Sequence, residues 1–174
     1  MSGSSWFQED YYLQEKLAHL QRTQPGDWGD KSAADVAQAF TQAGLTAEEH
    51  YLLYGDAEGL SPNQYFDRAY YIQAKAEQMV ETGKAGEASS ARVSFESALS
   101  DLGWTTAEHF EKFGWKEDVN PSSSFDVSSY LQSKAAQAGV SVDELKSIMD
   151  SSDISPLSHY FSWGSSEGIA VTEV

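Results

Sequence analysis

Three histidines stand where they could do chemistry, each directly before an aromatic residue: His50, His109 and His159. A glutamate precedes the first two, and histidine beside a carboxylate is common in zinc sites and in acid–base catalysis. Zinc, however, requires three or four ligands within about 2.0–2.3 Å of one ion. If the histidines belong to successive repeats, they lie about one repeat apart and do not share an ion. We therefore expect each histidine to be structural, packing beside the start of its helix and donating a hydrogen bond to a loop carbonyl.

Three glutamates recur in the same way, each three residues after a glycine: Glu58, Glu117 and Glu167. A carboxylate at this position could accept N–H bonds at the start of a neighbouring helix. It could also pair with a repeated lysine such as Lys75 or Lys134. We favour these structural roles for all three.

Calcium coordination is the alternative for the acids around the first of these glutamates, namely Asp56, Glu58 and Asp67. Calcium takes six to eight oxygen ligands, usually from acids at a regular spacing in one loop. The chain contains neither an Asp-x-Asp-x-Asp-Gly loop nor a Gly-Gly-x-Gly-x-Asp nonapeptide. We therefore expect no resident cofactor, with calcium as the possibility left open.

Sequence signatures of common enzyme classes are absent. There is no Gly-x-Ser-x-Gly elbow, no Walker A loop, no dinucleotide fingerprint and no His-Glu-x-x-His pair. The chain also has no cysteine, which excludes disulfides, zinc–thiolate sites and thiol catalysis. The sequence therefore predicts a protein that is not an enzyme and has no catalytic residues.

Charge and hydropathy restrict the partners. The formal net charge is −16 over 174 residues, which makes nucleic acid a poor partner because its binding depends on Lys and Arg neutralising phosphates. No apolar run approaches the ~18 residues that a membrane span requires, so we expect no membrane insertion. The N-terminal residues lack the basic and apolar regions of a signal peptide. The protein is therefore expected in the cytoplasm, or it is exported without a cleaved signal, or it is produced by trimming of a longer precursor.

A period in the sequence indicates how these residues are positioned. Phe7, Phe66 and Phe125 are 59 residues apart, and the tyrosines, glutamines and lysines that follow them align. The chain therefore divides into three repeat units, residues 6–64, 65–123 and 124–174. The third unit is nine residues shorter, because His159 follows His109 by 50 residues whereas His109 follows His50 by 59. We expect one domain over residues 1–174, with the units (about 59, 59 and 50 residues) packed as a tandem helical array.

Each unit is predicted to contain three helices, which gives an all-α fold of about nine helices. The first helix opens at an aromatic residue and a capping residue, as in Phe66-Asp67. The second and third open at capping boxes such as Ser141 with Glu144 and Thr105 with Glu108. A glycine is then expected to end the third helix in a left-handed conformation. These glycines are Gly55, Gly114 and Gly164.

Aromatic residues divide into core and candidate contact residues. Rings at helical spacing are expected in the core, including Tyr71, Phe95, Phe110 and Trp163. Trp28 and Trp115 occupy loop or helix-end positions instead. An exposed tryptophan there could stack on a sugar or anchor a protein partner, although it could also cover a joint between units. We take these two as the candidate partner or glycan contacts.

The repeated text resembles a known class of helical repeat. Phe-Asp-x-x-x-Tyr, followed by His-[Tyr/Phe]-x-x-[aromatic]-Gly-x-x-Glu-Gly-x-x-Pro, resembles repeats of large acidic bacterial proteins, secreted or at the surface. Some of these carry RTX-type calcium segments or adjoin glycosyltransferase domains. The resemblance runs from Phe7 to Gly168, but Asp118 replaces the usual Gly. The chain also lacks an Asn-Pro-Asp step and inserts a full middle helix.

The resemblance implies a repeat architecture and an extracellular or cell-surface setting, and it implies no catalytic residue. The sequence as a whole therefore predicts a structural or interaction module whose partner is a protein or a cell-surface component. A module that binds calcium or a glycan is the alternative. The sequence does not indicate an oligomeric state.

Overall fold

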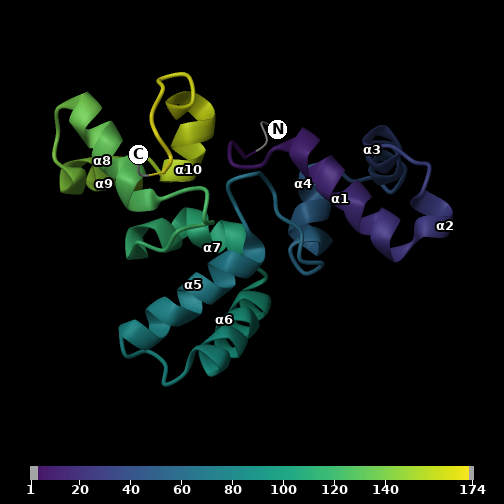
Figure 1. Ribbon diagram of the computed structural model, residues 1–174, viewed down its shortest axis with the longest axis horizontal. Helices are drawn as coiled ribbons and strands as arrows, with labels where there is room; N and C mark the ends of the chain where they lie inside the picture. Colours follow the sequence, from purple (N-terminus) through teal and green to yellow (C-terminus); the bar gives the residue numbers. More distant parts are fainter. Residues whose placement is uncertain (1–3, 173–174) are drawn as a thin grey trace. The chain divides into compact units, whose positions relative to one another are not determined.

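The computed structural model describes residues 4–172, and every regular element in that range is helical (Figure 1). The expectation of an all-α fold is therefore confirmed. Ten α-helices lie in the described range, one more than expected, because the predicted loop at residues 25–29 contains the short helix α2. The chain forms two compact bodies, and the division falls between Gln64 and Tyr65, where the first expected repeat unit ends.

The N-terminal body, which ends at Gln64, contains four α-helices. They are α1 (Glu9–Thr23), α2 (Pro25–Trp28), α3 (Ala33–Gln42) and α4 (Ala47–His50). The last continues as a π-helical turn, η1 (Tyr51–Gly55). Helix α1 packs against α3 and α4, as the purple and blue ribbons of Figure 1 show.

The C-terminal body, from Tyr65, contains two successive sets of helices. The first set is α5 (Arg68–Glu81), α6 (Ala88–Leu102), α7 (Thr106–Lys112) and the 3-10 turn η2 (Gly114–Glu117). The second set is α8 (Val127–Ala138), α9 (Val142–Ser151), α10 (Pro156–His159) and the π-helical turn η3 (Tyr160–Gly164). Helix α5 packs along α6, and α8 packs on α9 and α10.

The helix starts follow the sequence closely. The Asp67 side chain accepts from the Tyr70 N–H at 2.9 Å, and Phe66 packs on Tyr71 with ring centroids 5.4 Å apart. Thr105 and Glu108 form a full capping box, in which each side chain bonds the other residue's backbone N–H. The predicted staple and capping box are therefore confirmed, and they fix where α5 and α7 begin.

After each of the turns η1, η2 and η3, the chain comes back to the residue that precedes the first helix of the same set. The Gln8 N–H donates to the Pro62 carbonyl, and the Asp67 N–H donates to the Pro121 carbonyl. Asp126 makes the same bond to Val171. Donor and acceptor lie some fifty residues apart. In each set of helices, this one bond therefore joins the residue before the first helix to the stretch that follows the last turn.

The predicted left-handed glycines are wrong. None of Gly55, Gly114 and Gly164 has a positive φ. The left-handed position comes four residues later, at Gly59 (φ 82°), Asp118 (φ 57°) and Gly168 (φ 70°). Asp tolerates this conformation better than most residues, which explains how it replaces glycine in the repeated motif.

A different constraint requires glycine at the predicted positions. A Cβ on Gly114 would lie 2.1 Å from the Tyr71 hydroxyl oxygen, and a Cβ on Gly55 would lie 2.2 Å from that of Tyr12. Gly164 has the same relation to Tyr130. The missing side chain is therefore space for a tyrosine hydroxyl rather than freedom of the backbone.

The core is largely aromatic, as expected, with one exception. Tyr71, Phe95 and Phe110 are buried, but Trp163 is 50% exposed. Trp163 lies on η3, four residues after His159, and packs on that histidine at the surface. The expectation that Trp163 belongs to the core was therefore wrong.

Substituting Gly114 by alanine should destabilise the protein by about 1–3 kcal/mol, the usual cost of overpacking a filled site. Gly86→Ala is the matched control, because a Cβ there meets nothing within 4 Å. Chemical denaturation measures both. Gly114→Ala should cost less in a Tyr71→Phe background than in wild type, because the clashing oxygen is then absent. Equal stability of Gly114→Ala and Gly86→Ala would contradict the packing argument.

Candidate functional site

Each repeated histidine is bonded to a tyrosine from the first helix of its own set. The Tyr71 hydroxyl lies 2.7 Å from His109 Nδ1, and Tyr12 and Tyr130 stand 2.8 Å and 2.7 Å from the Nδ1 atoms of their histidines, His50 and His159. Each histidine thus links the third helix of its set to the first. The predicted partner, a loop carbonyl, was wrong, because the tyrosine hydroxyl occupies that place.

Burial decides the direction of this hydrogen bond. It lowers the pKa of His109 to about 4, with a smaller contribution from the charge of Lys75. Burial likewise raises the pKa of Tyr71 well above its ordinary value. At neutral pH the tyrosine hydroxyl therefore donates to an uncharged imidazole. A histidine held in this state is unsuited to proton transfer near pH 7.

A lysine–glutamate pair lies beside each tyrosine and histidine. The Lys16 Nζ is 2.6 Å from Glu58, the Lys75 Nζ is 2.5 Å from Glu117, and the pair formed by Lys134 and Glu167 measures 2.8 Å. Lys75 is only 5% exposed. The predicted pairing of the repeated glutamates with repeated lysines is therefore confirmed, and each carboxylate has a cation to bind.

The calcium candidates are engaged elsewhere. Asp56 accepts from the Tyr51 hydroxyl at 3.2 Å, Glu58 pairs with Lys16, and Asp67 caps α5 in the other body. Within residues 4–172, no group of three or more His, Cys, Asp or Glu residues could hold a metal ion. Asp56 and Glu58 thus have partners within the N-terminal body, and Asp67 within the C-terminal body.

Three exposed rings recur four residues after the histidines. Tyr54 is 52% exposed, Phe113 45% and Trp163 50%. Each packs on its own histidine, with ring centroids 5.5, 5.7 and 5.4 Å apart. Of the three, only Trp163 was assigned a place in the sequence analysis, in the core, and the exposure of the recurring position was missed.

Of the predicted contact tryptophans, one is buried. Trp115 is 1% exposed, and its indole N–H donates to the Glu111 carbonyl at 3.0 Å, so its ring offers no surface to a ligand. Trp28 is half-buried at the end of α2. Trp104 stacks on Phe113 at 5.7 Å with Lys112 over its ring, which extends the exposed aromatic surface there.

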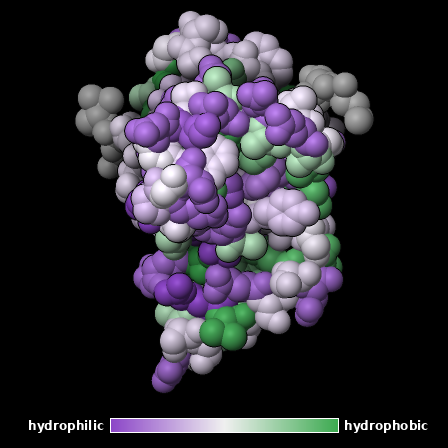
Figure 2. Space-filling view, turned by 90° about the vertical axis from the view of Figure 1, so that its right-hand side faces the viewer, coloured by the Kyte–Doolittle hydropathy of each residue, from purple (hydrophilic) through white to green (hydrophobic). Residues whose placement is uncertain are grey.

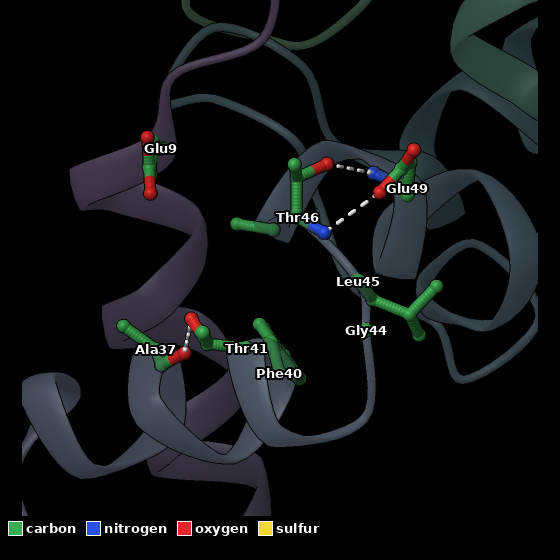
Figure 3. Close-up of a pocket in the computed structure, with 9 residues that line it drawn as sticks. Glu9, Ala37, Phe40, Thr41, Gly44, Leu45, Thr46 and Glu49 are labelled. Atoms are coloured by element: carbon green, nitrogen blue, oxygen red, sulfur yellow. Dashed lines mark hydrogen bonds between the residues drawn. The ribbon is translucent and has the colours of Figure 1, made fainter.

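A cavity of about 410 Å³ opens between α1, α3 and α4 in the N-terminal body (Figure 3). Thr46 and Glu49 on its wall are bonded to each other as a capping box. Glu9 and Phe40 line it from the other two helices. Thr46 and Glu49 are thus already bonded to each other, and Glu9 faces the cavity from α1.

A second cavity, of about 420 Å³, lies between α5 and the segment after η2. Its wall is acidic and includes Glu77, Glu81, Glu117 and Asp118. Two of these acids are paired with lysines, Glu117 with Lys75 and Asp118 with Lys146. Its chemistry is therefore that of an acidic surface, suited to basic groups.

Glu111 is a buried carboxyl group that the sequence analysis did not single out. It lies on α7, and its Oε2 accepts from the Ser158 hydroxyl of α10 at 2.6 Å, while no described group bonds its buried Oε1. Burial raises its pKa to about 7, against the opposing effect of the Ser158 bond. Glu111 therefore joins the two helix sets of the C-terminal body through a carboxyl group that ionises near neutrality.

The surface agrees with the composition. Hydrophilic residues dominate the face drawn in Figure 2, and hydrophobic ones appear there in separate patches. Among the described helices, none has the length and apolar character needed to cross a membrane.

No protein-family model, no curated protein and no solved structure matches this chain.

Glu111→Gln tests the buried carboxyl. A pKa raised from 4.5 to about 7 gives stability that is present below pH 4.5 and lost as the pH rises through 7. The loss should be on the order of 3 kcal/mol, given 1.36 kcal/mol for each pH unit. The variant lacks this loss, so its advantage over wild type should grow between pH 5 and 8.

Urea unfolding at several pH values measures the difference between the two proteins. Only the difference is informative, because His109, with its lowered pKa, adds stability that is lost in the opposite direction, as the pH falls from 6.5 towards 4. Glu81→Gln removes the same charge at an exposed site and serves as control. Parallel pH profiles for all three proteins would refute the assignment.

Proposed function

We propose that this chain is a non-enzymatic interaction module, built from three tandem helical repeats that each hold an exposed aromatic ring for a protein partner. The observation that carries the proposal is the recurrence of Tyr54, Phe113 and Trp163 at equivalent exposed positions. The resemblance of the repeated motif to repeats of bacterial surface and secreted proteins supports a setting at the cell surface or outside the cell.

The repeated polar residues support an architectural role for the interior. In each set, a tyrosine hydroxyl bonds a histidine and a lysine bonds a glutamate, as in Tyr71 with His109 and Lys75 with Glu117. These bonds leave no nucleophile next to a free base, which nucleophilic catalysis would require. The groups that looked reactive in the sequence thus hold helices together.

The exposed rings support an interaction role for the surface. Large aromatic side chains carry much of the binding energy in protein interfaces when they are already held in place. Each of the three rings packs on a histidine that is itself fixed by a tyrosine. A net charge of −16 favours a basic partner, both by steering its approach and by direct pairing.

The triple variant Tyr54→Ser, Phe113→Ser, Trp163→Ser should lose partner binding while it keeps its fold. A displayed library of random peptides, selected on the wild-type chain, should yield basic sequences that bind it. The selected peptides should bind the variant at least tenfold more weakly, because the loss of one anchoring ring typically exceeds about 1 kcal/mol. Fluorescence anisotropy measures the affinities.

The control is the triple variant Leu53→Ser, Val93→Ser, Leu102→Ser. These side chains are 60%, 69% and 61% exposed, but they do not occupy the repeated position after the histidine. Peptides that bind both triple variants as tightly as wild type would refute the role of the aromatic positions.

The alternative, a module that binds calcium or a glycan, makes a different prediction. A ligand that binds the native state raises the melting temperature. With Glu58 paired to Lys16 and Asp67 capping α5, we expect the same melting temperature in calcium and in EDTA, and none of a panel of glycans should raise it. A calcium-dependent rise that Glu58→Gln abolishes would favour the alternative.

A further inference from the structure

The three histidines differ in which residue of the middle helix of their set (α3, α6 or α9) packs against the imidazole ring. Phe40 of α3 stacks on His50 with centroids 4.1 Å apart and the planes 24° from parallel. Phe95 of α6 meets His109 at 4.8 Å, edge to face. Among the described residues, the rings in contact with His159 are Tyr130 and Trp163, and neither comes from α9.

The register of the middle helices identifies the residues that replace the phenylalanines. Each helix ends with the same backbone bond: from Leu45 to the Phe40 carbonyl, from Trp104 to that of Leu99, and from Ile154 to that of Met149. Met149 therefore takes the place of Phe40. Leu145, four residues earlier, takes the place of Phe95.

A cavity occupies the space that these substitutions leave. It measures about 250 Å³ and is lined by Val140, Leu145, Ile148, Met149, Ile154 and His159, among others. An apolar cavity of about 150 Å³ is known to accept benzene in another protein. Sites for larger ligands begin at about 300 Å³. The volume therefore fits one aromatic ring and little more.

The surroundings of the cavity are acidic. Lys134, on its wall, is neutralised by Glu167, and Lys146 on α9 is neutralised by Asp118. On the described part of the chain, Asp143 and Glu144 at the start of α9 have no cation paired with them. The acids therefore favour an aromatic ring flanked by positively charged residues over one flanked by neutral or anionic residues.

We propose that the cavity beside His159 binds a single aromatic side chain of a partner protein, carried in a segment rich in Lys and Arg. The ring takes the place against His159 that Phe40 takes against His50. This inference rests on the proposed role as an interaction module and assigns one subsite of it.

Methionine methyl NMR tests the subsite directly. The chain has three methionines, of which Met149 lines the cavity and Met79 lies on α5. With a Lys-Lys-Phe-Lys-Lys peptide, the methyl signal of Met149 should move by ring-current shift while that of Met79 stays. Lys-Lys-Ala-Lys-Lys should move neither, and Glu-Glu-Phe-Glu-Glu should bind at least tenfold more weakly at low salt.

Two variants extend the test. Leu145→Phe fills the cavity from the position of Phe95 and keeps Met149 as reporter, so the peptide should no longer shift its signal. Phe40→Met should open an equivalent cavity beside His50, and the new methyl group should respond to the same peptide. Circular dichroism checks that both variants fold. If Leu145→Phe does not fold, Phe40→Met still tests the proposal.

The outcomes separate the subsite from the interaction role. An unshifted Met149 at about 5 mM peptide, a concentration that detects even millimolar affinity, overturns the subsite. The peptide selection on the aromatic triple variant then judges the interaction role independently. An equal response to free phenethylamine and to the peptide would assign the cavity to a small aromatic amine and overturn the partner segment.

Discussion

The fold depends on a tyrosine hydroxyl buried between a histidine and a glycine. The Tyr71 oxygen bonds His109 Nδ1, and it occupies the space where a side chain on Gly114 would be. A buried hydroxyl without a partner is costly, so the bond holds the histidine of the third helix in place. The histidine in turn supports Phe113 at the surface. One polar contact thus links the first helix, the third helix and the exposed ring.

The sequence predicted the helices well where local chemistry decides them. Asp67 with Phe66, and Thr105 with Glu108, contain within a few residues all the information that starts a helix. The pairing of Glu117 with Lys75 was also accessible, because both recur with the same period. These predictions hold because capping, periodicity and opposite charge act over short or repeated distances.

The candidate site was harder to predict, because it depends on contacts between helices. The hydroxyl of Tyr71 explains Gly114, but the two lie more than forty residues apart, and a glycine after a helix ordinarily indicates a left-handed turn. Trp163 recurs at helical spacing like a core residue, and its exposure depends on how the third helix packs on the others. The burial of Trp115 and of the Glu111 carboxyl likewise follows from packing across elements.

The bonds that return each segment to its own first helix have a consequence for folding and for evolution. The contacts that fix a helix set join residues about forty positions apart, as with Tyr12 and His50 or Lys75 and Glu117. Closing a chain segment of this length costs little more entropy than closing one half as long. The length of these segments therefore adds little to the entropic cost of folding. A substitution that breaks such a bond in one set therefore leaves the corresponding bonds of the other sets in place, and each set can change in sequence separately.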